Sequence, residues 1–135
     1  MKTLSIRQPW LELMLQGRKD IEIRTWDTYY TGRLLLHASK LADVQACKSI
    51  GIQPYNFQNG VICGMGFLEK TVCYNEKTFK QDVKRHLNPV DWYDGRQYGW
   101  IFKDIHRIEP IKCNGHLSLW EYPDENKIKE LREER

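Results

Sequence analysis

Hydrophobic and polar residues alternate at every second position along several short stretches of the chain, the pattern of strands buried on one face. The alternation is cleanest over residues 20–26 and longest over residues 60–74. Residues 33–39 are more continuously apolar, which indicates a strand buried on both faces. In chain order, the pattern predicts strands over residues 3–7, 20–26, 33–39, 60–74, 98–105 and 117–122.

Apolar residues recur at helical spacing in three other stretches. The first begins at Gln8 and Pro9 and ends at Gly17, a residue type that commonly terminates helices. The other two helices are expected over residues 40–50 and 75–87. Beyond the last predicted strand, residues 124–135 are highly charged and predict a terminal helix or tail.

The order of these elements lacks the regular strand–helix alternation of a parallel doubly wound sheet. Gly64 and Gly66 fall on one face of the longest predicted strand, where glycines mark a bend, a bulge or a close backbone approach. Strands of a small barrel need such bends. We therefore predict an α+β fold, a small mixed β-barrel of about five to six strands flanked by helices.

Length and composition allow one domain within the 135 residues. We expect this domain over residues 1–123, followed by the charged segment 124–135. No apolar run approaches the roughly 18 residues of a membrane helix, and the first residues lack the apolar stretch of a secretory signal. The sequence therefore predicts a cytoplasmic protein without a membrane partner.

The net charge of +3 is weak evidence for any partner, but its distribution adds some information. Residues 1–40 carry +3, whereas residues 121–135 carry −2. A mildly basic N-terminal third suits a polyanion, although many proteins that bind no nucleic acid share this property. The four cysteines lack the close paired spacing of zinc sites and are expected to be free thiols: Cys47, Cys63, Cys73 and Cys113.

The densest group of candidate functional residues occupies residues 17–26. By strand alternation, Glu22, Arg24 and Trp26 share one face, and Lys19 lies just before the strand. Arginine offers a planar fork to a phosphate or a base edge, and tryptophan stacks on bases. The alternative is a solvated strand face with a surface ion pair, worth about 0–1 kcal/mol.

A second group, residues 5–10, lies at a strand-to-helix turn. It brings a cation, an amide and an aromatic ring together as Arg7, Gln8 and Trp10, and the free backbone N–H groups of such a turn suit an anion. The alternative is a capping turn with Trp10 in the core.

His37 and Ser39 share one face of the third predicted strand. Together with Lys19 or Glu22, they would form an acid–base or nucleophile arrangement if the fold brings them together. The alternative is that His37 is a buried, hydrogen-bonded histidine of the core.

These segments resemble the ASCH domain family. Its characteristic pattern, Gly-x-Lys-x-x-Glu-x-Arg, is complete here as Gly17, Lys19, Glu22 and Arg24. The resemblance extends roughly from residue 3 to residue 122, through segments that are similar to the family's first strand, its strand ending in His-Ala-Ser, and its closing strands. These segments are residues 4–10, 32–40, 98–102 and 115–120.

The resemblance implies a PUA-like fold with a cleft beside the first helix, in which RNA or a modified nucleoside binds. The residues that match the family's pattern, Lys19, Glu22 and Arg24, would line that cleft. Together with the two groups described above, the expected ligand-binding residues are Arg7, Gln8, Trp10, Lys19, Glu22, Arg24, Trp26, Ser39 and Lys40.

Some ASCH proteins are enzymes, and the resemblance therefore leaves catalysis open. One branch deacylates N4-acetylcytidine with a lysine and a threonine nucleophile three residues later. Lys19 matches that lysine, but Glu22 occupies the threonine position, which disfavours this activity. Other members resemble ribonucleases, in which Lys19 and Glu22 would act as general acid and base.

A ribonuclease of this kind would use a divalent metal at Glu22, but the sequence offers no second clear carboxylate for it. No metal-ligating set and no other cofactor is expected. The third alternative is a protein-interaction adaptor that uses the aromatic loop 91–97 and the acidic tail.

Overall fold

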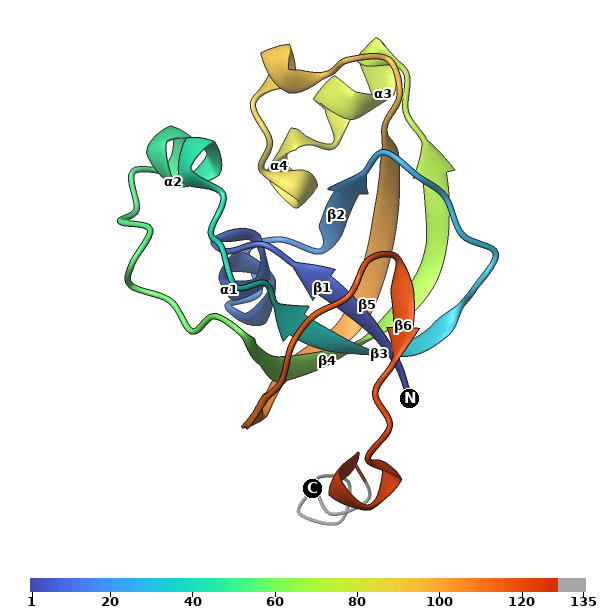
Figure 1. The fold of residues 1–135 in the computed structure, drawn as a ribbon. Coiled ribbons are helices and arrows are strands. Elements are labelled where there is room, and N and C mark those ends of the chain that lie inside the picture. Colours follow the sequence, from blue (N-terminus) through green and yellow to red (C-terminus); the bar gives the residue numbers. More distant parts are fainter. Residues whose placement is uncertain (129–135) are drawn as a thin grey trace.

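The computed structural model describes residues 1–128 of the chain. Within them, six strands form one mixed sheet in the order β2-β5-β4-β3-β1-β6 (Figure 1). The strands are β1 (Lys2–Ile6), β2 (Ile21–Arg24), β3 (Gly32–Ala38), β4 (Val61–Cys73), β5 (Tyr98–Lys112) and β6 (Leu119–Glu121). Strands β1 and β3 run parallel, and every other paired neighbour runs antiparallel. The expected α+β class is confirmed.

The long strands β4 and β5 bend the sheet into a deep curve (Figure 1). Their pairing shifts register at three places, and irregularities of this kind bend strands. Gly64 provides room at the centre of the curve, because a Cβ there would lie 2.7 Å from a methyl carbon of Leu15. The glycines of this strand therefore mark a bend with a close approach, as the sequence predicted.

The curved sheet is barrel-like, but its edge strands β2 and β6 do not pair with each other. A side chain bridges part of the gap instead. The Arg24 guanidinium at the end of β2 donates a hydrogen bond to the carbonyl of Ser5 in β1. Strand β6 pairs β1 only along Lys2–Leu4, which leaves the Ser5 carbonyl free to accept it.

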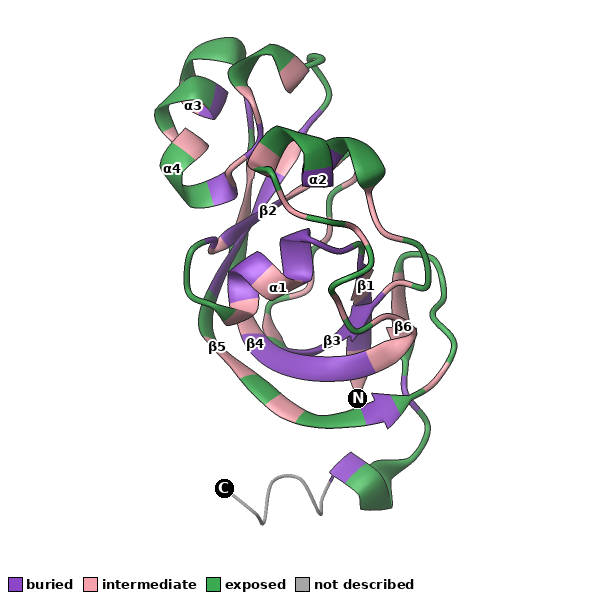
Figure 2. Ribbon diagram, turned by 90° about the vertical axis from the view of Figure 1, so that its left-hand side faces the viewer, coloured by how far each residue is buried: buried purple, intermediate pink, exposed green. Residues whose placement is uncertain are grey.

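The helices are α1 (Trp10–Leu15), α2 (Val44–Ile50), α3 (Glu76–Gln81) and α4 (Val83–His86), together with the short 3-10 helix η1 (Val90–Trp92). Helix α1 lies inside the curve of the sheet (Figure 2). Its side chains Leu11 and Met14 are completely buried in the main core, which also contains Leu34 and Leu36 of β3. This core fixes the position of the chain on both sides of α1, where most candidate residues lie.

Several predicted elements differ from the observed ones. Helix α2 starts at Val44 rather than residue 40, because Asp43 caps it by accepting a hydrogen bond from the Ala46 N–H. The helix predicted over residues 75–87 breaks at Asp82 into α3 and α4. Strand β2 ends at Arg24, two residues early, and η1 occupies part of the expected 91–97 loop.

Strand β5 is a further difference, since it continues to Lys112 instead of ending at residue 105. Its second half is largely exposed and therefore loses the apolar alternation on which the prediction relied. Pairing with β4, which continues to Val61 opposite Lys112, holds this half in the sheet.

Residues 125–128 are helical, and Ile128 is buried against a second apolar cluster that includes Leu35 and Met65. The amino group of Met1 forms ion pairs with Glu121 and Glu125. The remainder of the predicted charged segment, residues 129–135, lies outside the described residues. The division at residue 123 stays a prediction. No helix of residues 1–128 is both long and apolar enough to cross a membrane.

Candidate functional site

A pocket of about 700 Å³ opens beside the first turn of α1, just before the start of β6 and where the Arg24 side chain bridges β2 and β1. Two loops, residues 39–43 and 114–117, form its mouth. Its lining residues are Ser5, Arg7, Trp10, Glu22, Ile23, Arg24, His37, Ser39, Lys40, Leu41, Asp43, Asn114, Gly115, His116 and Leu117. The pocket thus gathers six of the nine residues expected to bind a ligand.

Glu22 is the central acidic group of the pocket and is only 5 % exposed. One carboxylate oxygen lies 3.4 Å from Lys19 Nζ, and the other lies 3.4 Å from Arg24 Nε. Both distances exceed the roughly 2.8 Å of a charge-assisted hydrogen bond. Arg24 Nε is itself buried and has no hydrogen-bond partner among the described residues. A carboxylate and a guanidinium therefore face the pocket with unused hydrogen-bonding capacity.

Lys19 lies beneath Glu22 and is 1 % exposed. Its ammonium donates hydrogen bonds to the carbonyls of Ile21, at 2.6 Å, and His86, at 2.7 Å, and it lies over the Trp10 ring. Burial lowers the pKa of Lys19 from 10.5 to about 8, and the neighbouring Glu22 opposes this shift. Two carbonyls and a carboxylate surround the three N–H groups of Lys19. Lys19 therefore does not line the pocket.

Two further cations, Arg7 and Lys40, lie exposed at the mouth of the pocket. Neither forms an ion pair within residues 1–128. The mouth also carries two exposed apolar side chains, Leu41 at 73 % and Leu117 at 93 %. The interior is therefore polar, while the rim offers positive charge and apolar surface.

Besides Lys19, two further expected ligand-binding residues do not line the pocket. Trp26 was expected on the same strand face as Glu22 and Arg24, but β2 ends at Arg24 and the alternation stops there. The Trp26 ring instead packs edge-on against Trp100, with ring centroids 4.7 Å apart. Gln8 is buried. Its side-chain amide donates a hydrogen bond to the Gln58 carbonyl and accepts one from the backbone N–H of Glu12 in α1.

His37 has a different partner from the one considered in the sequence. Its Nδ1 lies 3.0 Å from Ser5 Oγ, and its Nε2 lies 2.9 Å from the Cys113 carbonyl. Ser39 lines the pocket without a hydrogen bond to His37. Strands β1 and β3 run parallel with Ser5 opposite His37, a register that sequence alternation cannot supply.

Sequence reasoning also missed the loop 114–117 and Asp43 as lining residues. Asp43 accepts a hydrogen bond from Trp10 Nε1, which holds the indole at the pocket wall. The loop overlaps the segment 115–120 that resembles a closing strand of the family, and this resemblance was the available signal for it.

Gly115 marks the closest approach of this loop to the pocket floor. A Cβ at this position would lie 2.7 Å from both Ser5 Oγ and His37 Cε1. These side chains are held by hydrogen bonds and cannot move freely away from it.

We expect Gly115→Ala to reduce the free energy of unfolding by about 1–3 kcal/mol, because overpacking displaces hydrogen-bonded neighbours. Urea denaturation measures this loss, with the exposed neighbour Asn114→Ala as the control. Equal stability of the two variants would contradict the packing argument.

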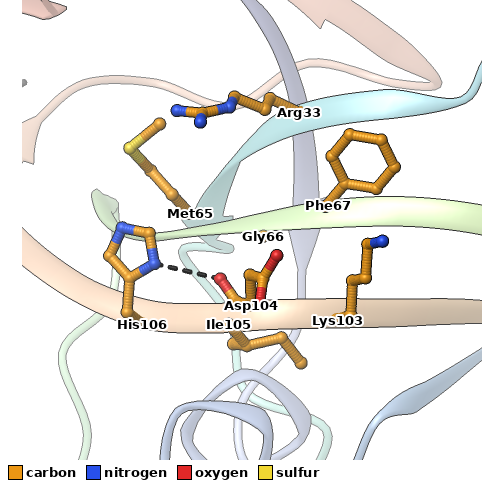
Figure 3. A pocket seen from close by; sticks show the side chains of 8 residues that line it. All are labelled: Arg33, Met65, Gly66, Phe67, Lys103, Asp104, Ile105 and His106. Carbon is orange, nitrogen blue, oxygen red and sulfur yellow. Dashed lines mark hydrogen bonds between the residues drawn. The ribbon is translucent and has the colours of Figure 1, made fainter.

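A second hollow, of about 560 Å³, lies on the other face of β3, β4 and β5 (Figure 3). The cross-strand row Arg33, Phe67 and Lys103 borders it, and Lys103 Nζ lies 4.9 Å from the Phe67 ring centroid. His106 turns towards Asp104, and its Nδ1–H donates a hydrogen bond to the Asp104 carbonyl. None of the expected site residues lines this hollow, so its exposed cations serve below as controls.

No group of three or more His, Cys, Asp or Glu side chains that could hold a metal occurs in the described part of the chain. All four cysteines are free thiols there, and burial raises the pKa of Cys63 to about 11.

The fold agrees with a comparison against families of known proteins. The model of the ASCH domain matches residues 4–113, and the chain therefore belongs to the ASCH domain family. Human activating signal cointegrator 1 is 30 % identical over 91 residues, a match that includes 58 % of this chain. The match spans only 15 % of the human protein.

Solved structures support the same fold. The ASCH protein of Zymomonas mobilis superimposes with a TM-score of 0.68 over 97 % of this chain and 93 % of that one, at 15 % identity. Two single-residue variants of that protein give TM-scores of 0.67 and 0.64, also at 15 % identity. They cover 97 % of this chain and 94 % and 96 % of theirs. At this identity, the likeness concerns the fold alone.

Proposed function

We propose that this ASCH domain binds RNA or a modified nucleoside in the pocket, with a base edge facing Glu22 and Arg24. One observation carries the proposal. A carboxylate that is nine-tenths buried and an adjacent guanidinium line the pocket without hydrogen bonds to each other among the described residues. Leaving buried polar groups unsatisfied costs about 1–3 kcal/mol each, which a complementary ligand would recover.

The two groups suit a base that presents a donor beside an acceptor. A carboxylate accepts from an amino or imino N–H, as glutamate does with the amino group of cytosine. The neighbouring arginine donates to a carbonyl or ring nitrogen of the same edge. Cytosine and guanine offer this combination with an amino group at one end of the edge and a carbonyl at the other. The donor of uracil, its imino N3–H, lies between two carbonyls, so a carboxylate that accepts from it also meets a carbonyl oxygen.

The rim supports a polynucleotide rather than a free base. Arg7 and Lys40 are exposed, unpaired with carboxylates in the described chain, and placed where flanking phosphates would pass. Leu41 and Leu117 offer apolar surface to a neighbouring base or ribose. Membership of the ASCH family, whose resemblance implied such a ligand, supports the same conclusion.

Chemistry at the Lys19–Glu22 pair is less well supported. The Lys19 ammonium is buried beneath Glu22 and engaged with the Ile21 and His86 carbonyls, so a ligand in the pocket would meet Glu22 first. Lys19 is better explained as a positioning residue that orients the Glu22 carboxylate. The adaptor alternative would gain support if no nucleoside or RNA binds.

The proposal is tested by isothermal titration of the purified domain with cytidine, guanosine, adenosine and uridine, and with short single-stranded RNAs carrying each base. We expect RNA that contains cytosine or guanine to bind tighter than oligouridine. Equal affinities for all four bases would contradict the base-edge argument, and no binding of any would overturn the proposed function.

Salt dependence provides a separate prediction for the rim. RNA affinity is expected to fall with salt, because phosphate contacts release counterions. Arg7→Gln and Lys40→Gln should each flatten the plot of log affinity against log salt by about 0.7 per lost phosphate contact. Lys103→Gln, which removes an exposed cation from the other face, is the control. If Lys103→Gln flattens the salt plot equally, Arg7 and Lys40 do not contact the phosphates of the RNA.

A further inference from the structure

Ser5 and His37 form a hydrogen-bonded pair in the floor of the same pocket, and the proposed binding function leaves this pair unused. They lie directly opposite each other in the parallel pairing of β1 and β3. Ser5 Oγ lies 3.0 Å from His37 Nδ1, and both residues line the pocket. A hydroxyl within hydrogen-bond reach of an imidazole is the first requirement of an activated nucleophile.

The surroundings of His37 decide which ring nitrogen carries the proton. Its Nε2 lies 2.9 Å from the carbonyl of Cys113, which can only accept a hydrogen bond. Nε2 therefore carries the hydrogen in the neutral ring, and Nδ1 presents a lone pair to the Ser5 hydroxyl. Burial lowers the pKa of His37 and favours this neutral form. The carbonyl orients the base, which is the role of the third group in a nucleophile–base–orienter arrangement.

The hydroxyl itself is oriented from a second side. Trp120 Nε1 donates to Ser5 Oγ at 3.2 Å, so the oxygen accepts there while its own hydrogen points at Nδ1. A hydroxyl held in this way has its proton already directed at the base. Gly115 has no side chain that would crowd this oxygen, since a Cβ there would lie 2.7 Å from it.

A group that stabilises negative charge lies next to the pair. The Arg24 guanidinium donates to the backbone carbonyl of Ser5, and its buried Nε has no hydrogen-bond partner in the described chain. A cationic donor beside the nucleophile suits the oxyanion that forms when a hydroxyl attacks a carbonyl carbon. Nucleophile, base, orienting carbonyl and oxyanion donor therefore meet in one pocket.

We propose that Ser5 is the nucleophile of an acyl-transfer reaction on an oxygen ester bound in this pocket, with His37 as its general base. Ser5 Oγ bonds to the ester carbonyl carbon while its proton passes to His37 Nδ1. The bond from that carbon to the alcohol oxygen then breaks, and the alcohol leaves with the proton from His37. Water, deprotonated by His37, then bonds to the acyl carbon, the bond from that carbon to Ser5 Oγ breaks, and His37 returns the proton to Oγ, which releases a carboxylic acid. The identification of the alcohol as a nucleoside or RNA hydroxyl rests on the proposed function. The reaction at Ser5 does not depend on it.

The test uses the purified domain with p-nitrophenyl acetate and with a fluorophosphonate probe, followed by intact mass spectrometry and peptide mapping. We expect one label per chain, on Ser5. Ser5→Ala should lose the label completely, and His37→Gln should slow it by about 100-fold, the lower end of what a general base contributes. Ser49→Ala, which removes an exposed hydroxyl on α2, is the control and should react like the unmodified chain.

Three outcomes would overturn the nucleophile assignment: no label on the unmodified chain, a label mapped elsewhere, or equal labelling of Ser5→Ala. Ser5→Cys covers the case in which Ser5→Ala fails to fold, because a thiolate paired with His37 should be alkylated by iodoacetamide faster than the four native thiols. Nucleoside titration of the same samples separates the two proposals. Binding without labelling refutes the acyl transfer alone, and labelling without binding refutes the proposed function alone.

Discussion

Replacing Lys19 with methionine is expected to lower the free energy of unfolding by about 3 kcal/mol, because it leaves the buried Glu22 carboxylate without its lysine partner. Lys19 is fully buried, pairs with Glu22 and donates to the carbonyls of Ile21 and His86. Methionine fills much of the same volume but provides none of these hydrogen bonds. Urea denaturation at neutral pH measures the loss, with Lys103→Met as the exposed control, for which a change within about 0.5 kcal/mol is expected.

The double variant Lys19→Met/Glu22→Gln tests the reason for this loss. If the stranded carboxylate causes it, removing the charge of Glu22 should restore part of the stability. A double variant that is as unstable as the sum of the two single variants would show that the pair does not act as a unit. A Lys19→Met variant as stable as its control would contradict the whole argument.

The pH dependence of stability should change together with this substitution. Burial lowers the pKa of Lys19 to about 8 in the folded chain, against 10.5 for the ordinary lysine. Between these values the unfolded chain binds the proton more readily than the folded chain, so stability rises with pH. The free energy of unfolding of the unmodified chain should therefore rise relative to that of Lys19→Met from pH 8 to pH 10. Parallel pH profiles of the two proteins would contradict a lowered pKa of the buried Lys19.

Glu22→Gln is expected to weaken binding of cytidine or cytosine-containing RNA by about 30- to 100-fold. This corresponds to the loss of one charge-assisted hydrogen bond worth about 2–3 kcal/mol. Affinity for uridine should fall less or rise, because the amide can donate to a carbonyl that the carboxylate repels. Titration of the variant with both nucleosides measures the change in discrimination.

The control for this prediction is Arg33→Gln, which lies in the hollow on the other face (Figure 3). Nucleoside affinity of this variant should equal that of the unmodified chain. Because Glu22 also contacts Lys19, circular dichroism must show that Glu22→Gln is folded at the titration temperature. An unchanged ratio of cytidine to uridine affinity in folded Glu22→Gln would remove Glu22 from base recognition.

Much of the fold could be predicted from local patterns. The expected strands correspond to β1 to β6, because most of them alternate apolar and polar residues where one face is buried and β3 is continuously apolar. The predictions failed where packing overrides the pattern. β2 ends two residues before Trp26, whose indole joins the core beside Trp100, and the polar half of β5 stays in the sheet through its pairing with β4.

The same distinction applies to the site. Glu22 and Arg24 share a strand face by alternation alone, and the structure places both in the pocket. The roles of Lys19 and Gln8 could not be predicted in this way, because the partners that bury them come from α4 and from the loop before β4. Residue type and spacing describe what a side chain can do, but not whether residues from other segments already form hydrogen bonds with it.

By itself, the sequence determined the family, the strand and helix content, and the local grouping of Lys19, Glu22 and Arg24, since these depend on residues that are near each other in the chain. Only the tertiary structure decided that Ser5 meets His37, that the loop around Gly115 covers them, and that Arg24 reaches the β1 backbone. These contacts join residues far apart in sequence, and strand register and the curvature of the sheet bring them together.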